Sequence, residues 1–124
     1  MKDSRLLIFA HGSQDSRWRL PFEELTASLT EPHGADEVRL VYMEFVRPSL
    51  ADTLQEAARD GKFHLRVLPL FLPAAAHVAE DVPRQIADTP GDFPEGKIEL
   101  LKPIGEHPRV KDVFRDIACD YVRD

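Results

Sequence analysis

The sequence lacks the features that staple a small protein or anchor it in a membrane. Its 124 residues include one cysteine, Cys119, so no disulfide can form within the chain. No apolar run approaches the roughly 20 residues that span a bilayer. The apolar stretch at residues 6–10 is also too short for the core of a signal peptide. These absences predict a cytoplasmic protein without a membrane partner.

Clustered positive charge is also missing. The formal net charge is -6, and the lysines and arginines are scattered, whereas nucleic-acid binding depends on concentrated basic side chains. Glycine-rich phosphate motifs, HExxH, CxxC and GxSxG do not occur. We therefore expect neither a nucleic-acid partner nor an organic cofactor. The length fits one domain over residues 1–124, large enough to bury a core.

Strand-like and helix-like segments alternate along the chain. Apolar runs rich in β-branched and aromatic residues predict strands, and amphipathic spacing after each run predicts a helix. Ser49 and Asp52 form a capping box that opens the second helix, Gly61 closes that helix, and Pro108 opens the last one. The expected strands cover residues 6–10, 38–45, 65–72 and 97–101. This order predicts an α/β fold of three layers, in which helices cover both faces of a four-stranded, mainly parallel sheet, as in half of a flavodoxin-like domain.

Polar residues follow the predicted strands at their carboxyl ends, where open α/β sheets bind ligands. His11 comes directly after the first strand, Glu44 ends the second, and His77 follows the third after a short loop. Imidazole and carboxylate groups together bind divalent cations, and imidazole accepts protons near neutral pH. This edge of the sheet is therefore a candidate metal site.

Each of these residues also has a structural interpretation. A histidine after a strand often only makes hydrogen bonds, and Ser13 is suited to cap the next helix. Glu44 could sit in solvent at a strand end, and His77 could start a helix with its ring exposed. A hydrolase built on His11 and Ser13 is a further alternative, although neighbours in sequence rarely have nucleophile-to-base geometry.

Four ordered motifs carry a resemblance over nearly the whole chain. They are FAHGS at residues 9–13, YMEF at 42–45 with Pro48 beyond it, PLFL at 69–72 followed by HVAEDVP at 77–83, and KPIG at 102–105. In this combination the chain resembles the short class II tetrapyrrole chelatases of the CbiX type. The resemblance implies insertion of Co²⁺, Fe²⁺ or Ni²⁺, as substrate, into sirohydrochlorin without ATP. It also implies a homodimer with the macrocycle between its subunits.

Carried over position by position, the resemblance assigns His11 and His77 as the active-site histidines that present the metal and accept protons. Glu44 matches an acidic residue of part of the family, and would offset metal charge or orient an imidazole. Further positions expected to contact or support the substrate are Ser13, Arg47 and Glu80. Arg17 and Arg19 are additional candidates to pair with its carboxylates, against the long-range repulsion from a net charge of -6.

The chain departs from the resemblance at one loop position. Ala75 stands two residues before His77, where the family commonly has glycine. This departure keeps an alternative open, a non-catalytic metal-binding or interaction module that retains the fold and the histidines. The residue types do not choose among cobalt, iron and nickel, because all three accept imidazole.

Overall fold

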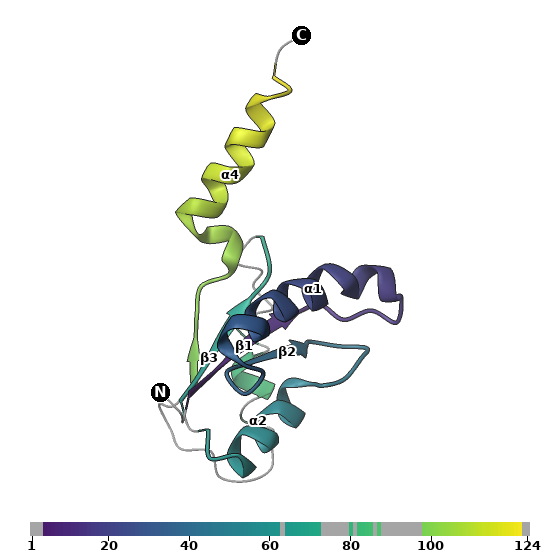
Figure 1. The fold of residues 1–124 in the computed structure, drawn as a ribbon, viewed down its shortest axis with the longest axis vertical. Helices are drawn as coiled ribbons and strands as arrows, with labels where there is room; N and C mark the ends of the chain where they lie inside the picture. The colour runs from purple at the N-terminus through teal and green to yellow at the C-terminus, as the bar shows by residue number, and fades with distance from the viewer. Residues whose placement is uncertain are drawn as a thin grey trace.

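The computed structural model describes residues 4–62, 64–72, 80, 82–85, 87 and 98–122. These residues form strands and helices in alternation around one sheet, with a final helix that rises away from the body (Figure 1). Within the described residues, none of the helices has the length and apolar character needed to cross a membrane.

The sheet has four strands in the order β2-β1-β3-β4, and all neighbouring pairs are parallel. Its strands are β1 (Ser4–Ala10), β2 (Val38–Tyr42), β3 (His64–Pro69) and β4 (Ile98–Leu100). The register sets Ile8 of β1 between Leu40 of β2 and Leu68 of β3. The α/β class and the parallel sheet predicted from the sequence are confirmed.

Two helices are fixed by the local signals that the sequence carries. Helix α1 (Ser16–His33) has Asp15 as its N-cap and ends at Gly34, which has a φ of 92°. Helix α2 (Leu50–Arg59) begins with the predicted capping box, in which the Ser49 hydroxyl accepts from the Asp52 N–H and the Asp52 carboxylate accepts from the Ser49 N–H. Gly61 follows α2 with a φ of 73°, a conformation that glycine adopts without strain.

The core lies on the α2 side of the sheet. Leu7 and Phe9 of β1 pack there with Leu54 of α2, and Val82 joins them from the helical residues 82–85. Helix α1 packs on the opposite face, mainly along β2, and none of its described residues is buried. The two crossovers from β1 to β2 and from β2 to β3 run in opposite directions, which places α1 and α2 on opposite faces.

A buried guanidinium ties the start of β1 to the carboxyl end of α2 and to the turn before β2. The side chain of Arg5 is fully buried and contacts the carboxylates of Asp36, Glu56 and Asp60 at 2.8, 3.3 and 3.3 Å. Lys62, also buried, pairs with Asp36 at 2.8 Å. Burying a charge is costly unless it is paired, so this cluster fixes the chain where β1, α2 and the α1–β2 turn meet.

The second predicted strand, residues 38–45, is too long by three residues. β2 ends at Tyr42, after which Phe45 adopts a φ of 71° and the Val46 N–H donates to the Glu44 carbonyl at 2.9 Å. Glu44 therefore lies in a tight turn beyond the strand and not within it. The third strand likewise ends earlier than predicted, at Pro69, and one more backbone bond, from Leu70 N–H to Phe9 O, continues it.

The last helix departs from the expected three layers, in which the helices cover the faces of the sheet. After the 3₁₀ turn η1 (Ile104–Glu106), α4 (Pro108–Cys119) begins at the predicted proline, but none of its residues is buried. Its imidazole N-cap, His107, accepts from the Arg109 N–H. Figure 1 shows α4 directed away from the sheet. The two faces are thus covered by α1 and by α2 with residues 82–85, while α4 covers neither.

Candidate functional site

His11 and Glu44, predicted from separate strand ends, meet at the carboxyl edge of the sheet. The Nδ1 atom of His11 lies 2.9 Å from Oε1 of Glu44, and the same oxygen accepts the Gly12 N–H at 3.2 Å. The histidine side chain is 63% exposed and the glutamate side chain 30%. The pair is thus anchored on the protein side and open on the solvent side.

This geometry fixes which ring nitrogen of His11 faces outward. An ionised carboxylate is only an acceptor, so its partner Nδ1 must carry the proton. In the neutral ring the Nε2 atom then keeps its lone pair, free for a cation or a proton. A carboxylate behind a histidine is the arrangement that orients metal-binding imidazoles in proteins.

Gly12 is required for the turn that brings Glu44 behind His11. A Cβ at this position would lie 1.9 Å from the Glu44 carbonyl oxygen, far inside van der Waals contact. The Met43 N–H, in turn, donates to the Ala10 carbonyl at 2.9 Å and keeps the two strand ends together. The close approach explains the glycine in the HGS motif.

Phe71 supports the ring of His11, a contact that sequence reasoning missed. The two ring centroids are 4.4 Å apart, and Phe71 also packs edge-on against Phe9 at 6.1 Å. Gly105 holds the segment that carries Phe71: its N–H donates to the Phe71 carbonyl at 2.9 Å, and a Cβ there would lie 2.0 Å from the Leu72 carbonyl oxygen. The PLFL motif contains Phe71 and the KPIG motif contains Gly105, so these two motifs could have pointed to both residues.

Ser13 shapes the turn between β1 and α1. Its hydroxyl accepts the Asp15 N–H at 3.0 Å, and its carbonyl accepts from Arg19 at 2.9 Å. Asp15, not Ser13, is the N-cap of α1, which corrects the capping role considered for the serine. Among the described contacts, the Ser13 hydroxyl bonds the Asp15 N–H and not Nε2 of His11, as a serine nucleophile would, so they do not favour a serine hydrolase.

The arginines predicted near this edge pair with carboxylates of the chain itself. Arg47 makes two bonds to Asp52, at 2.6 and 2.9 Å, and Arg17 contacts Asp15 at 2.7 Å. The Arg47 guanidinium, and then the Ser49 N–H, hold the pKa of the Asp52 carboxyl well below its usual range. Arg17 lowers the pKa of Asp15 in the same way. Both arginine side chains remain more than four-fifths exposed.

The second predicted histidine, His77, lies outside the described residues. Glu80 is exposed and helical. Within the described part of the chain, no group of three or more histidine, cysteine, aspartate or glutamate side chains is placed to hold a metal ion. His11 and Glu44 are thus the candidate set that the structure itself brings together.

Comparison with known proteins shows the family of this chain. The sequence profile of the CbiX family matches residues 5–121. The chain belongs to the CbiX family. Among curated members, the chain is 26% identical over 118 residues to the sirohydrochlorin cobaltochelatase of Sulfurisphaera tokodaii, covering 95% of this chain and 93% of the relative. It is 29% identical over 111 residues to the chloroplastic sirohydrochlorin ferrochelatase of Arabidopsis thaliana, covering 90% of this chain.

Solved structures show the same fold. A cobalamin-biosynthesis CbiX protein of Marinobacter aquaeolei VT8 superposes with a TM-score of 0.74 at 33% identity, covering 94% of this chain and 93% of that one. The sirohydrochlorin chelatase SirB of Bacillus subtilis subspecies spizizenii, solved with cobalt, gives 0.79 at 24% identity. The CbiX chain described here spans 52% of SirB and 49% of the Arabidopsis enzyme, about half of each.

Proposed function

We propose that this CbiX-family chain inserts Co²⁺ or Fe²⁺ into sirohydrochlorin without ATP, as a step in cobalamin or sirohaem synthesis. The observation that carries the proposal is the Nδ1 contact of His11 with Glu44, which leaves Nε2 open at the carboxyl edge of the sheet. The family and its named cobaltochelatases and ferrochelatases support the same activity.

The chemistry of insertion matches what this pair can do. A divalent metal must exchange bound water for ring nitrogens, while two pyrrole N–H groups each lose a proton. In the proposal, His11 binds the incoming metal through Nε2 and releases it to the ring; its imidazole then accepts one of the two protons, and the imidazole of His77 accepts the other. Glu44 offsets part of the metal charge and holds the imidazole in one orientation.

The remaining assignments belong to the same proposal. His77 supplies the second imidazole, Glu80 lies one turn beyond it, and Ser13 and Arg47 contact the substrate carboxylates. We further propose a homodimer in the cytoplasm, with the metal as substrate and with no organic cofactor, nucleic acid or membrane partner. The lack of basic clusters supports the proposed absence of a nucleic-acid partner. The single cysteine is typical of a cytoplasmic protein.

Anaerobic absorption spectroscopy of sirohydrochlorin tests the activity. With Co²⁺ or Fe²⁺, the protein should insert the metal faster than the rate without protein, and should do so through many turnovers. The His11→Ala variant should lose that acceleration. His33→Ala removes the same side chain from the far end of α1 and should behave as wild type. Tight binding of one metal per chain with insertion no faster than the blank would instead establish the non-catalytic metal-binding module.

A further inference from the structure

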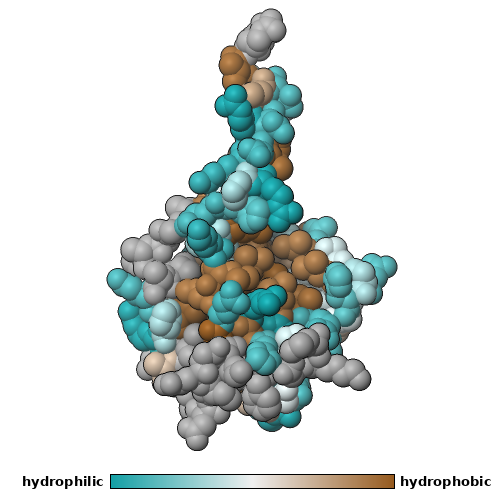
Figure 2. Space-filling view, turned by 90° about the vertical axis from the view of Figure 1, so that its left-hand side faces the viewer, coloured by the Kyte–Doolittle hydropathy of each residue, from teal (hydrophilic) through white to brown (hydrophobic). Residues whose placement is uncertain are grey.

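Part of the α1 face of the sheet is open to solvent. Helix α1 packs mainly along β2, and α4 rises away from the sheet (Figure 1). Figure 2 shows hydrophobic surface gathered directly below α4, with hydrophilic side chains lying across it. The apolar stripe of α4 is itself exposed, at Val113, Phe114, Ile117 and Tyr121. In the middle of β3, on the open face, the side chain of Arg66 is 71% exposed.

The sequence of β3 suits an open, polar face. Interior strands of a parallel sheet usually form unbroken apolar runs, because helices cover both of their faces. β3 alternates instead: Leu65 and Val67 are buried in the core on the α2 side, whereas His64 and Arg66 lie on the α1 side. This end of β3 therefore favours polar surroundings over the apolar side of a helix.

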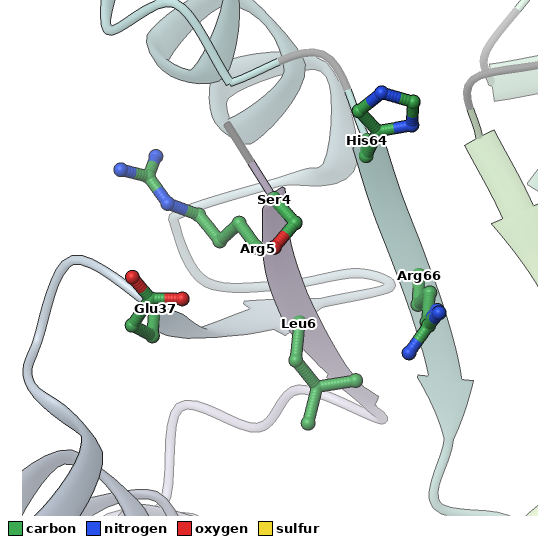
Figure 3. A pocket seen from close by; sticks show the side chains of 6 residues that line it. All are labelled: Ser4, Arg5, Leu6, Glu37, His64 and Arg66. Atoms are coloured by element: carbon green, nitrogen blue, oxygen red, sulfur yellow. The ribbon is translucent and has the colours of Figure 1, made fainter. Parts of the chain in front are cut away.

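These polar side chains line a hollow of about 420 Å³ at the amino end of the strands. His64 and Arg66 line it from β3, Ser4 and Leu6 from β1, and Glu37 from the turn before β2 (Figure 3). Leu6 is paired with Arg66 in the register, and its N–H donates to the Glu37 carbonyl at 2.8 Å. Figure 3 accordingly shows Leu6 between Glu37 on one side and Arg66 on the other.

The two charges on either side of Leu6 are both loosely paired. Among the described residues, Arg66 forms an ion pair only with Glu99, at 3.4 Å, and both of these side chains are mostly exposed. Exposed pairs of this kind are weak. Glu37 comes no closer than 4.0 Å to Lys62, whereas Lys62 holds Asp36 at 2.8 Å. The hollow thus presents one guanidinium and one carboxylate that can each take a further partner.

We infer that this hollow binds a small zwitterion in which an aliphatic chain separates an ammonium group from a carboxylate. The ligand carboxylate pairs with the planar guanidinium of Arg66, its ammonium group pairs with Glu37, and its methylene groups cross Leu6. Arg5 also lines the hollow, but its guanidinium is already neutralised by its own carboxylate cluster. The charges of Arg66 and Glu37 therefore balance, which favours a zwitterion over a ligand with a single charge.

The hollow is separate from the candidate metal site. Leu6 lies five residues before His11, and at about 3.3 Å per residue along a strand the two are about 16 Å apart. A small ligand in the hollow does not reach a metal ion at His11. Binding here therefore does not depend on the proposed function, and the two can fail separately.

An NMR titration of the nitrogen-15-labelled protein with 6-aminohexanoate tests the site. The amide signals of Leu6 and Arg66 should shift and saturate, with a dissociation constant on the order of 1 mM. Hexanoate and hexylamine have the same chain with one charge each, and should bind at least about 10-fold more weakly. A lack of saturable shifts below about 20 mM, or equal binding of the singly charged probes, overturns the inference.

Two substitutions assign the two ends of the ligand. Arg66→Gln should leave 6-aminohexanoate binding no better than hexylamine, because the carboxylate loses its partner. Glu37→Gln should leave it binding no better than hexanoate. Arg59→Gln and Glu24→Gln remove the same charges from exposed positions on α2 and α1, and should leave binding unchanged. The amide spectrum shows whether each variant is folded, and a folded Arg66 or Glu37 variant that binds like wild type would overturn the assignment.

Discussion

Replacing Glu44 with glutamine isolates the charge behind His11. A glutamine amide oxygen can still accept from the Nδ1–H of His11, 2.9 Å away, and from the Gly12 N–H, 3.2 Å away. The substitution therefore keeps the hydrogen bonds and the shape of the turn while it removes one negative charge. Any loss of activity with the fold intact then reports on electrostatics at the metal position.

The size of the effect follows from the distances. With ordinary imidazole and metal–nitrogen geometry, a cation on Nε2 would lie about 6–7 Å from the carboxylate oxygen. A divalent cation and a unit negative charge at that separation attract by about 1 kcal/mol in water and by about 2.5 kcal/mol at an effective dielectric constant of about 40. Glu44 is 30% exposed, which places it between these limits. Glu44→Gln should therefore reduce the efficiency of metal use roughly 5- to 70-fold.

The assay is the initial rate of metal insertion into sirohydrochlorin over a range of Co²⁺ concentrations. The loss should appear mainly as a higher KM for the metal, since the missing charge acts on the metal. Glu24→Gln makes the same change on the exposed side of α1 and should leave the curve unchanged. A Glu44→Gln protein that keeps the wild-type metal dependence would refute the electrostatic role.

Three further changes test other parts of the structure. Gly12→Ala should lower both the thermal midpoint and the insertion rate, because its Cβ would lie 1.9 Å from the Glu44 carbonyl oxygen; unchanged values in calorimetry and turnover would contradict the required close approach. Arg5→Met should reduce the free energy of unfolding in urea by about 2 kcal/mol, since it removes the buried cation of a carboxylate cluster, and an unaltered midpoint would argue against that cluster. Asp52→Asn should destabilise the protein by about 0.5–1 kcal/mol at pH 7. The lowered pKa of Asp52 means that its carboxylate stabilises the fold above about pH 4 and does so less as the pH falls further, so the two proteins should converge in acid; a gap that widens there would contradict the sign.

Local signals in the sequence were enough to predict the elements and one half of the site. The capping box at Ser49 and Asp52 depends on neighbouring residues, so its pattern is visible without a structure. The pairing of His11 with Glu44 was also predictable, because parallel strands set their carboxyl ends at one edge. The placement of His77 beside them stays a prediction.

What could not be predicted depends on contacts between distant segments or on backbone detail. The residues that follow Tyr42 favour strand by composition, and only the positive φ of Phe45 turns the chain and carries Glu44 out of β2. The contact of Phe71 with His11 joins segments that follow two different strands, so the PLFL motif marks the residue without showing what it contacts. The stripe on α4 shows which side of the helix favours burial but not which surface, or which molecule, covers it.

Nitrogen-15 NMR of the imidazole rings tests the central claim most directly, that Glu44 holds His11 with Nε2 free for the metal. At a pH where the ring is neutral, the account predicts that His11 carries its proton on Nδ1, and that addition of diamagnetic Zn²⁺ shifts Nε2. In Glu44→Gln the zinc response should need a higher metal concentration. A neutral ring protonated on Nε2, or a zinc response confined to Nδ1, would contradict the account.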